Sequence, residues 1–76
     1  MRNNDFLSVV VTCYEMGSMI NEAVRSVWDA ERQPDEVLLV DDGSHGGETL
    51  ENIRELERYA SNNSLPLKVI RQRNRG

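Results

Sequence analysis

The stretch EVLLVDDGSHGG, residues 36–47, decides the fold of this chain. Four apolar residues are followed by two carboxylates, Asp41 and Asp42, and three glycines fall within the next five positions. A continuous apolar run is typical of a buried strand, and the glycines permit a sharp turn after it. The stretch therefore predicts a strand over residues 36–40 that delivers two acidic side chains to one edge of a sheet.

The segments before this stretch show a strand pattern and then a helix pattern. LSVVVTCY, residues 7–14, is an almost continuous run of β-branched and apolar residues, which predicts a strand covered on both faces. Residues 17–30 carry apolar side chains at the i, i+3, i+4, i+7 spacing of one helical face, with Ser18 as the expected N-cap. The apolar positions are Ile20, Ala23, Val24 and Val27.

The segments after the stretch repeat the alternation. TLENIRELERYA, residues 49–60, has the apolar stripe of a second helix, and Ser44 or Thr49 is the expected N-cap. SNNS at residues 61–64 is expected to end this helix, and PLKVIR at residues 66–71 is predicted to be a third strand. A β-α-β-α-β order predicts a parallel sheet with right-handed crossovers, which is half of a Rossmann-like, doubly wound α/β fold.

Length, charge and cysteine content limit the class of protein. The 76 residues form at most one small domain, and the net charge of −4 argues against a general nucleic-acid binder, which needs a basic face. No apolar run approaches the roughly 20 residues of a membrane span, and no signal-peptidase site follows the first apolar run. The single cysteine, Cys13, cannot form an internal disulfide and favours a cytoplasmic location.

The polar segments that follow the predicted strands are the candidate site. Ligands of open α/β sheets bind beyond the carboxyl ends of the strands, which here lead into TCYE (residues 12–15), DDGS (residues 41–44) and RQRNRG (residues 71–76). The ionised Asp pair could accept a hydrogen bond from a nucleobase or a ribose, hold a metal ion, or cap the turn through backbone amides. We expect a division of roles, in which Asp41 is mainly structural and Asp42 faces the ligand.

The other side chains of these segments leave alternatives open. Tyr14 could stack on a planar base or pack at the strand end. Glu15 could accept a hydrogen bond from a ligand or stay solvated, and Thr12 could contact a ligand or be buried in its strand. The arginines near the C-terminus could attract a diphosphate, although a solvated, frayed tail is the more common outcome. These arginines are Arg71, Arg73 and Arg75.

Other α/β domains fit the pattern less well. A dinucleotide-binding domain or a P-loop needs a glycine-rich turn after the first strand, whereas CYEMGSM at residues 13–19 contains one glycine. VLLVDDG, residues 37–43, is similar to the start of a receiver-like signalling module, in which the acidic pair follows the first strand. Here a complete strand and helix precede the pair, so a non-catalytic interaction module of this kind is the second choice.

Taken in order, these segments resemble the N-terminal part of a family 2 glycosyltransferase with the GT-A fold. The residues that carry the resemblance are SVVVTCYE (8–15), INEAVRSVWDAERQPDEVLLVDDGS (20–44), TLENIREL (49–56) and KVIRQRNRG (68–76). The spacing of VDDGS from CYE and from NRG makes the combination specific. The resemblance implies that residues 1–76 form a single truncated nucleotide-sugar-binding subdomain, part of a three-layer α/β fold with a parallel sheet in strand order 3-2-1.

The resemblance also implies an activity. Enzymes of this family transfer a sugar from a nucleotide-diphosphate donor, often a UDP-sugar, to an acceptor hydroxyl with inversion. Their metal-binding Asp-x-Asp motif and catalytic base normally lie further along the chain than residue 76. A divalent cation (Mg²⁺ or Mn²⁺) is therefore expected for the full-length enzyme but not on these residues, and the isolated chain is expected to be inactive. The absence of a later strand predicts self-association through the edge of SVVVTC, residues 8–13.

Residue by residue, the resemblance implies a set of nucleotide contacts and no catalytic residue. The nucleotide-binding positions are Thr12, Tyr14, Glu15, Asp41, Asp42 and Asn74. Tyr14 would lie against the base, Asp42 would bind the base, and Asp41 would support the turn. Thr12 stands where proline is common in the family, and Glu15 stands where asparagine is usual.

Overall fold

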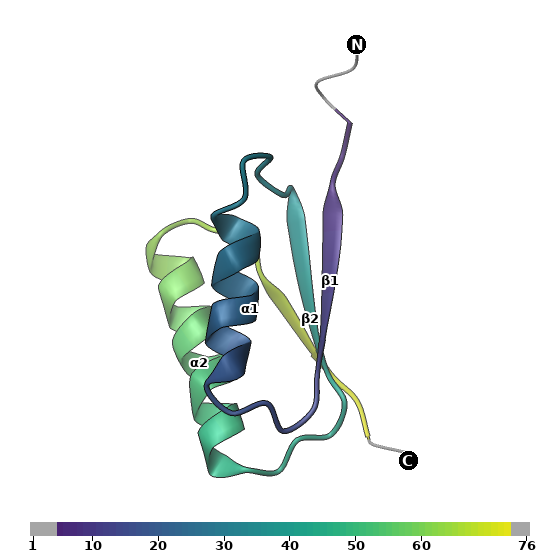
Figure 1. Cartoon of the computed structure of the whole chain (residues 1–76), viewed down its shortest axis with the longest axis vertical. Helices are drawn as coiled ribbons and strands as arrows, with labels where there is room; N and C mark the ends of the chain where they lie inside the picture. The colour runs from purple at the N-terminus through teal and green to yellow at the C-terminus, as the bar shows by residue number, and fades with distance from the viewer. Residues whose placement is uncertain (1–4, 74–76) are drawn as a thin grey trace.

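The chain folds as alternating strands and helices, as its sequence predicts. The structure is a computed structural model that describes residues 5–73. The elements are β1 (Ser8–Cys13), α1 (Met19–Trp28), β2 (Glu36–Asp41), α2 (Gly47–Asn62) and β3 (Lys68–Arg71) (Figure 1). The predicted β-α-β-α-β order is confirmed.

The three strands form one parallel sheet in the order β1-β2-β3, which confirms the predicted order read from the opposite edge. The register pairs Cys13 with Asp41 and Asp41 with Arg71. The carboxyl ends of all three strands therefore lie in one row across the sheet.

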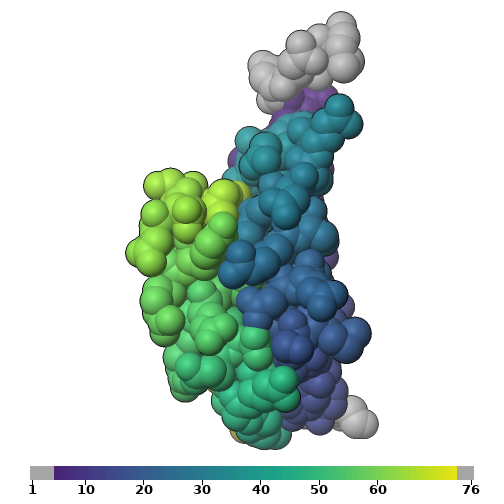
Figure 2. All heavy atoms as spheres, turned by 60° about the vertical axis from the view of Figure 1, so that its left-hand side comes forward, coloured from purple at the N-terminus to yellow at the C-terminus, as the bar shows by residue number. Residues whose placement is uncertain are grey.

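Both helices cover the same face of the sheet (Figure 1). Turned to bring the helices forward, Figure 2 shows the side chains of α1 and α2 next to each other over this face. The buried apolar residues between the helices and the sheet form one core. They are Cys13, Ile20, Val24, Trp28, Val37, Leu39, Ile53, Leu56 and Ala60.

The opposite face of the sheet is open among residues 5–73, so the expectation that the strands are covered on both faces is wrong for this part of the chain. Val10 is 57% exposed and Ile70 is 37% exposed. The reason lies in the topology: when successive strands are added in one direction by crossovers of one hand, every crossover helix falls on the same face. A second layer of helices needs a reversal of strand order, which these elements do not contain.

The helix ends differ in part from the sequence prediction. Ser18 is at the N-cap of α1, as predicted, but its side chain makes no capping hydrogen bond. Helix α2 begins at Gly47 with Gly46 as its N-cap, so neither Ser44 nor Thr49 caps it. Both hydroxyls instead accept amide hydrogen bonds from the loop after β1, which local sequence patterns cannot show.

Trp28 packs the ends of the two helices together. It is buried in the core, and its indole N–H donates a 3.0 Å hydrogen bond to the carbonyl of Pro66. Its ring lies 6.0 Å from that of Tyr59, so the ends of α1 and α2 are joined by aromatic contact. In the described part of the chain, no helix has the length and apolarity needed to cross a membrane.

Candidate functional site

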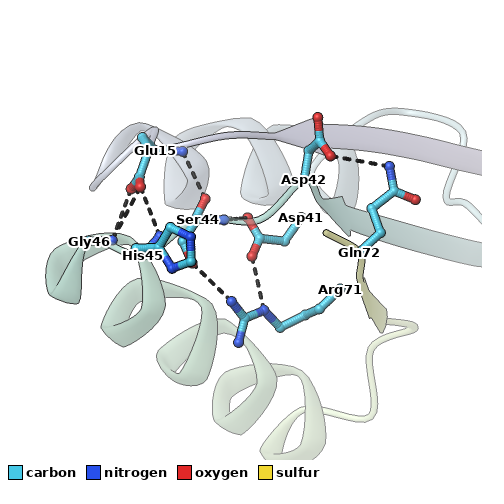
Figure 3. A network of polar contacts seen from close by, with 8 residues as sticks. All are labelled: Glu15, Asp41, Asp42, Ser44, His45, Gly46, Arg71 and Gln72. Carbon is cyan, nitrogen blue, oxygen red and sulfur yellow. Dashed lines mark hydrogen bonds and ion pairs between the residues drawn. The ribbon is translucent and has the colours of Figure 1, made fainter. Parts of the chain in front are cut away.

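The loops that follow the three strands meet at the carboxyl edge of the sheet (Figure 3). Backbone pairing continues one residue beyond the strands: the amide of Asp42 donates to the carbonyl of Cys13 at 2.8 Å, and the amide of Gln72 donates to the carbonyl of Asp41 at 2.9 Å. The first residues of the loops after β2 and β3 are therefore held by the same kind of backbone hydrogen bond as the strands.

Asp41 is fully buried and supports the turn after β2, as the sequence predicts. One carboxylate oxygen accepts the amide of Ser44 at 3.4 Å, and the other accepts Nε of Arg71 at 3.0 Å. Gly43 has a φ of 84°, which glycine adopts without steric cost, so the chain can turn back toward this carboxylate. A buried carboxylate with a cationic partner and an amide donor is a structural unit.

Arg71 is not part of a frayed tail. It ends β3, and besides its contact with Asp41 it donates from Nη2 to the carbonyl of Ser44 at 2.9 Å. Its guanidinium thus connects β3 to the loop after β2. Attraction of a diphosphate by this arginine was the other alternative, and it stays a prediction. Arg73 is exposed, and Arg75 lies outside the described residues.

Asp42 points away from Asp41, because successive strand residues project to opposite faces (Figure 3). It is partly exposed, and its Oδ1 accepts the side-chain amide of Gln72 at 3.4 Å. The edge of the sheet thus presents a carboxylate acceptor next to an amide donor. Sequence reasoning missed Gln72. The structure pairs Asp41 with Arg71, and the residues that follow them, Asp42 and Gln72, therefore lie side by side.

Tyr14 and Thr12 are both accessible. Tyr14 is 52% exposed immediately after β1 and is not part of the core, so an aromatic face is available near the carboxyl edge. Thr12 is exposed on the open face of the sheet, in register with Val40. Their contacts with a base or a nucleotide remain predictions, and Asn74 lies outside the described residues.

Glu15 is held by the loop before α2. Its carboxylate accepts the backbone amides of His45 at 2.8 Å and of Gly46 at 3.1 Å, and its own amide donates to the hydroxyl of Ser44 at 2.8 Å. The donors seen here are backbone amides of the protein, and a hydrogen bond from a ligand to Glu15 stays a prediction. The carboxylate also lies at the positive end of the α2 dipole, where a negative charge is stabilised.

Cys13 is not a reactive thiolate, and the described residues contain no cluster of metal ligands. Burial raises the pKa of the Cys13 thiol, and the nearby Asp41 carboxylate acts in the same direction, so the thiol stays protonated at neutral pH. Among residues 5–73, no three His, Cys, Asp or Glu side chains come together so as to hold a metal ion.

A parallel sheet whose polar loops gather at the carboxyl ends of its strands is the arrangement of Rossmann-like ligand-binding domains. Comparison with models of protein families finds a match to glycosyl transferase family 2 over residues 8–76, and the chain belongs to this family. No curated protein and no solved structure matches the chain. The family match agrees with the resemblance seen in the sequence and gives no support to a receiver-like module.

Proposed function

We propose that this chain forms the donor-binding part of a glycosyltransferase whose substrate is a nucleotide-diphosphate sugar, in particular a UDP-sugar. The observation that carries the proposal is the position of Asp42. It stands at the carboxyl end of the middle strand, partly exposed, beside the amide of Gln72 and near the exposed ring of Tyr14. The family match over nearly the whole chain supplies the class of reaction.

The chemistry of these side chains suits a nucleobase. An ionised carboxylate accepts hydrogen bonds only, so Asp42 would take the N–H of uracil, and the Gln72 amide would donate to an adjacent carbonyl. Tyr14 would stack on the face of the base, since an aromatic ring suits any planar heterocycle. Thr12 and Asn74 would border the nucleotide, and Asp41 would keep the turn in place.

The remaining parts of the reaction are proposed by family resemblance. In an inverting transfer, the acceptor hydroxyl attacks the anomeric carbon opposite to the leaving nucleoside diphosphate, and a base removes the hydroxyl proton. A divalent cation would neutralise charge on the leaving diphosphate. Among residues 5–73 no three His, Cys, Asp or Glu side chains come together to hold that cation, so we propose that these residues bind the donor nucleotide rather than carry out the transfer. We propose that the isolated chain binds nucleotide without transferring sugar.

Two further proposals concern the surroundings of the chain. Among the described strands β1 is paired on one side only, which supports self-association through its free edge. Cys13 is a free, buried thiol, which supports a reducing, cytoplasmic location.

Titration of the chain with UDP and Mg²⁺, followed by NMR, tests the proposed function. We expect the amide resonances of Asp42, Gly43 and Gln72 to shift at millimolar UDP, while that of Trp28, at the far end of α1, does not move. Inorganic pyrophosphate with Mg²⁺ is the control, and it should leave the Asp42 resonance in place because it has no base. If millimolar UDP shifts none of these resonances, the chain has no preformed nucleotide site and the proposal is wrong.

A further inference from the structure

The loop that carries Tyr14 and the loop that carries Asp42 are joined by a set of hydrogen bonds centred on Glu15. The Glu15 carboxylate accepts two amides before α2, and the Glu15 amide donates to the buried Ser44 hydroxyl. A fourth runs parallel to them, from the amide of Gly17 to the hydroxyl of Thr49 at 2.9 Å. We call these contacts the loop clasp.

The backbone of Glu15 supports a special role for this residue. Its φ is 50°, in the left-handed region that residues other than glycine, asparagine and aspartate rarely adopt. Such a conformation persists only where surrounding contacts fix it, and here the contacts are those of the loop clasp. The left-handed turn at Glu15 sends its carboxylate toward His45 and Gly46 and away from Asp42 (Figure 3).

Gly46 packs closely against the Glu15 carboxylate. A Cβ added at Gly46 would lie 2.9 Å from Oε1 of Glu15, closer than real Cβ atoms approach an oxygen, so the flexible end of the Glu15 side chain would have to move away. A Cβ added at Gly47, one residue later, would meet nothing within 4 Å. The chain therefore offers two neighbouring glycines, one of which is packed against the Glu15 carboxylate and one of which is not.

We propose that Glu15 is a positioning residue for nucleotide binding, which acts by fixing the Tyr14 loop against the Asp42 loop rather than by touching the nucleotide. The inference rests on the proposed function and deepens it. The carboxylate oxygens are occupied by backbone amides, so their hydrogen-bonding capacity is directed into the protein. A base held between Tyr14 and Asp42 needs these two side chains at a fixed separation, and the loop clasp connects the segments that carry them.

The experiment compares Glu15→Ala, Gly46→Ala, their double variant and the matched control Gly47→Ala, with uridine and UDP as ligands. Uridine has no phosphate, so the removal of a negative charge at residue 15 does not alter its binding directly. The measured affinity falls with the fraction of chains that keep the arrangement that binds the base, and loss of a contact of about 1 kcal/mol reduces that fraction by up to about fivefold. We expect Glu15→Ala and Gly46→Ala each to weaken uridine and UDP binding by about fivefold, and Gly47→Ala to bind like the unchanged chain. The double variant should be no weaker than either single one, because both changes break the same contact.

Hydrogen exchange provides a readout that does not need a ligand. The amides of His45 and Gly46 should lose protection in Glu15→Ala and keep it in Gly47→Ala, since they donate to the Glu15 carboxylate. The positioning role is overturned if Gly46→Ala and Gly47→Ala bind uridine equally well, or if Glu15→Ala weakens UDP but not uridine, which would mean direct action on the diphosphate. If the unchanged chain binds neither ligand, the proposed function fails, and the exchange result alone decides whether the loop clasp exists.

Discussion

Asp41 and Asp42 are adjacent in the sequence but lie in different environments. Asp41 projects into the helix-covered side of the sheet and is fully buried, whereas Asp42 projects the other way and is partly exposed. Strand alternation alone predicts that the two side chains project to opposite faces of the sheet. The ion pair of Asp41 with Arg71 could not be predicted in the same way, because it depends on the register between β2 and β3.

The first prediction concerns this ion pair. Arg71→Met should destabilise the fold by about 1–2 kcal/mol, because it removes the cationic partner of the buried Asp41 carboxylate. The value is below that for a fully buried pair, since the Arg71 side chain is 52% exposed and water screens part of the interaction. Urea unfolding of Arg71→Met and of the unchanged chain gives the difference in their free energies of unfolding.

Arg54→Met is the matched control for Arg71→Met. Arg54 also pairs with an acid at 3.0 Å, but its side chain is 63% exposed and that of its partner Glu51 is 58% exposed. Exposed pairs of this kind contribute about 0–1 kcal/mol, so the control should lose little stability. Equal losses of unfolding free energy in Arg71→Met and Arg54→Met would show that burial of Asp41 does not strengthen its ion pair.

The elements themselves were largely predictable, but their ends were not. Apolar periodicity places both helices, and continuous apolar runs place the first two strands. The start of α2 escapes this reasoning, since Ser44 and Thr49 look like N-caps but use their hydroxyls for the loop after β1. A tertiary contact thus replaces the local one that these residues usually make.

The start of β1 provides a pH-dependent prediction. Asp35 accepts the amide of Leu7 at 2.8 Å and pairs with Arg32 at 3.2 Å, and these contacts hold the pKa of Asp35 below its ordinary value of 3.8. A lowered pKa means that the folded state favours the ionised form. The stabilisation is therefore fully present above pH 3.8 and is lost as the pH falls below 3.8 through the lowered pKa.

Asp35→Asn should accordingly melt at a lower temperature than the unchanged chain at pH 7, by a small amount because the carboxylate is exposed. The difference should shrink as the pH falls below 3.8. Thermal unfolding over this pH range measures it, with Glu55→Gln on the exposed side of α2 as control. A difference that stays constant with pH would contradict the role of the ionised carboxylate.

At the level of the whole chain, the sequence predicts the α/β class and the strand order but not the open face of the sheet. The apolar run of β1 suggests burial on both faces, yet both helices lie on one side, and Val10 remains 57% exposed. Residue patterns report what a strand prefers to contact. Topology decides which of its faces the described elements cover.

Self-association is the prediction that follows from this exposure. Among the described strands β1 has a neighbour on one edge only, and the other edge together with the open apolar face favours pairing with a second copy. Sedimentation velocity at increasing concentration should show dimers or larger species, and Val10→Lys should shift them toward monomer. Ser26→Lys on exposed α1 surface adds the same charge and should have no such effect. A monodisperse monomer at high concentration would contradict self-association through β1.

The assignment of Asp42 to base recognition is the centre of the proposed function, and calorimetric titration with UDP in the presence of Mg²⁺ tests it most directly. We expect weak binding by the unchanged chain and by Glu31→Ala, an exposed acid in the loop between α1 and β2. Asp42→Ala should weaken that binding by about tenfold, as expected for the loss of a hydrogen bond to a charged group. Equal UDP affinities of Asp42→Ala and the unchanged chain would contradict the assignment.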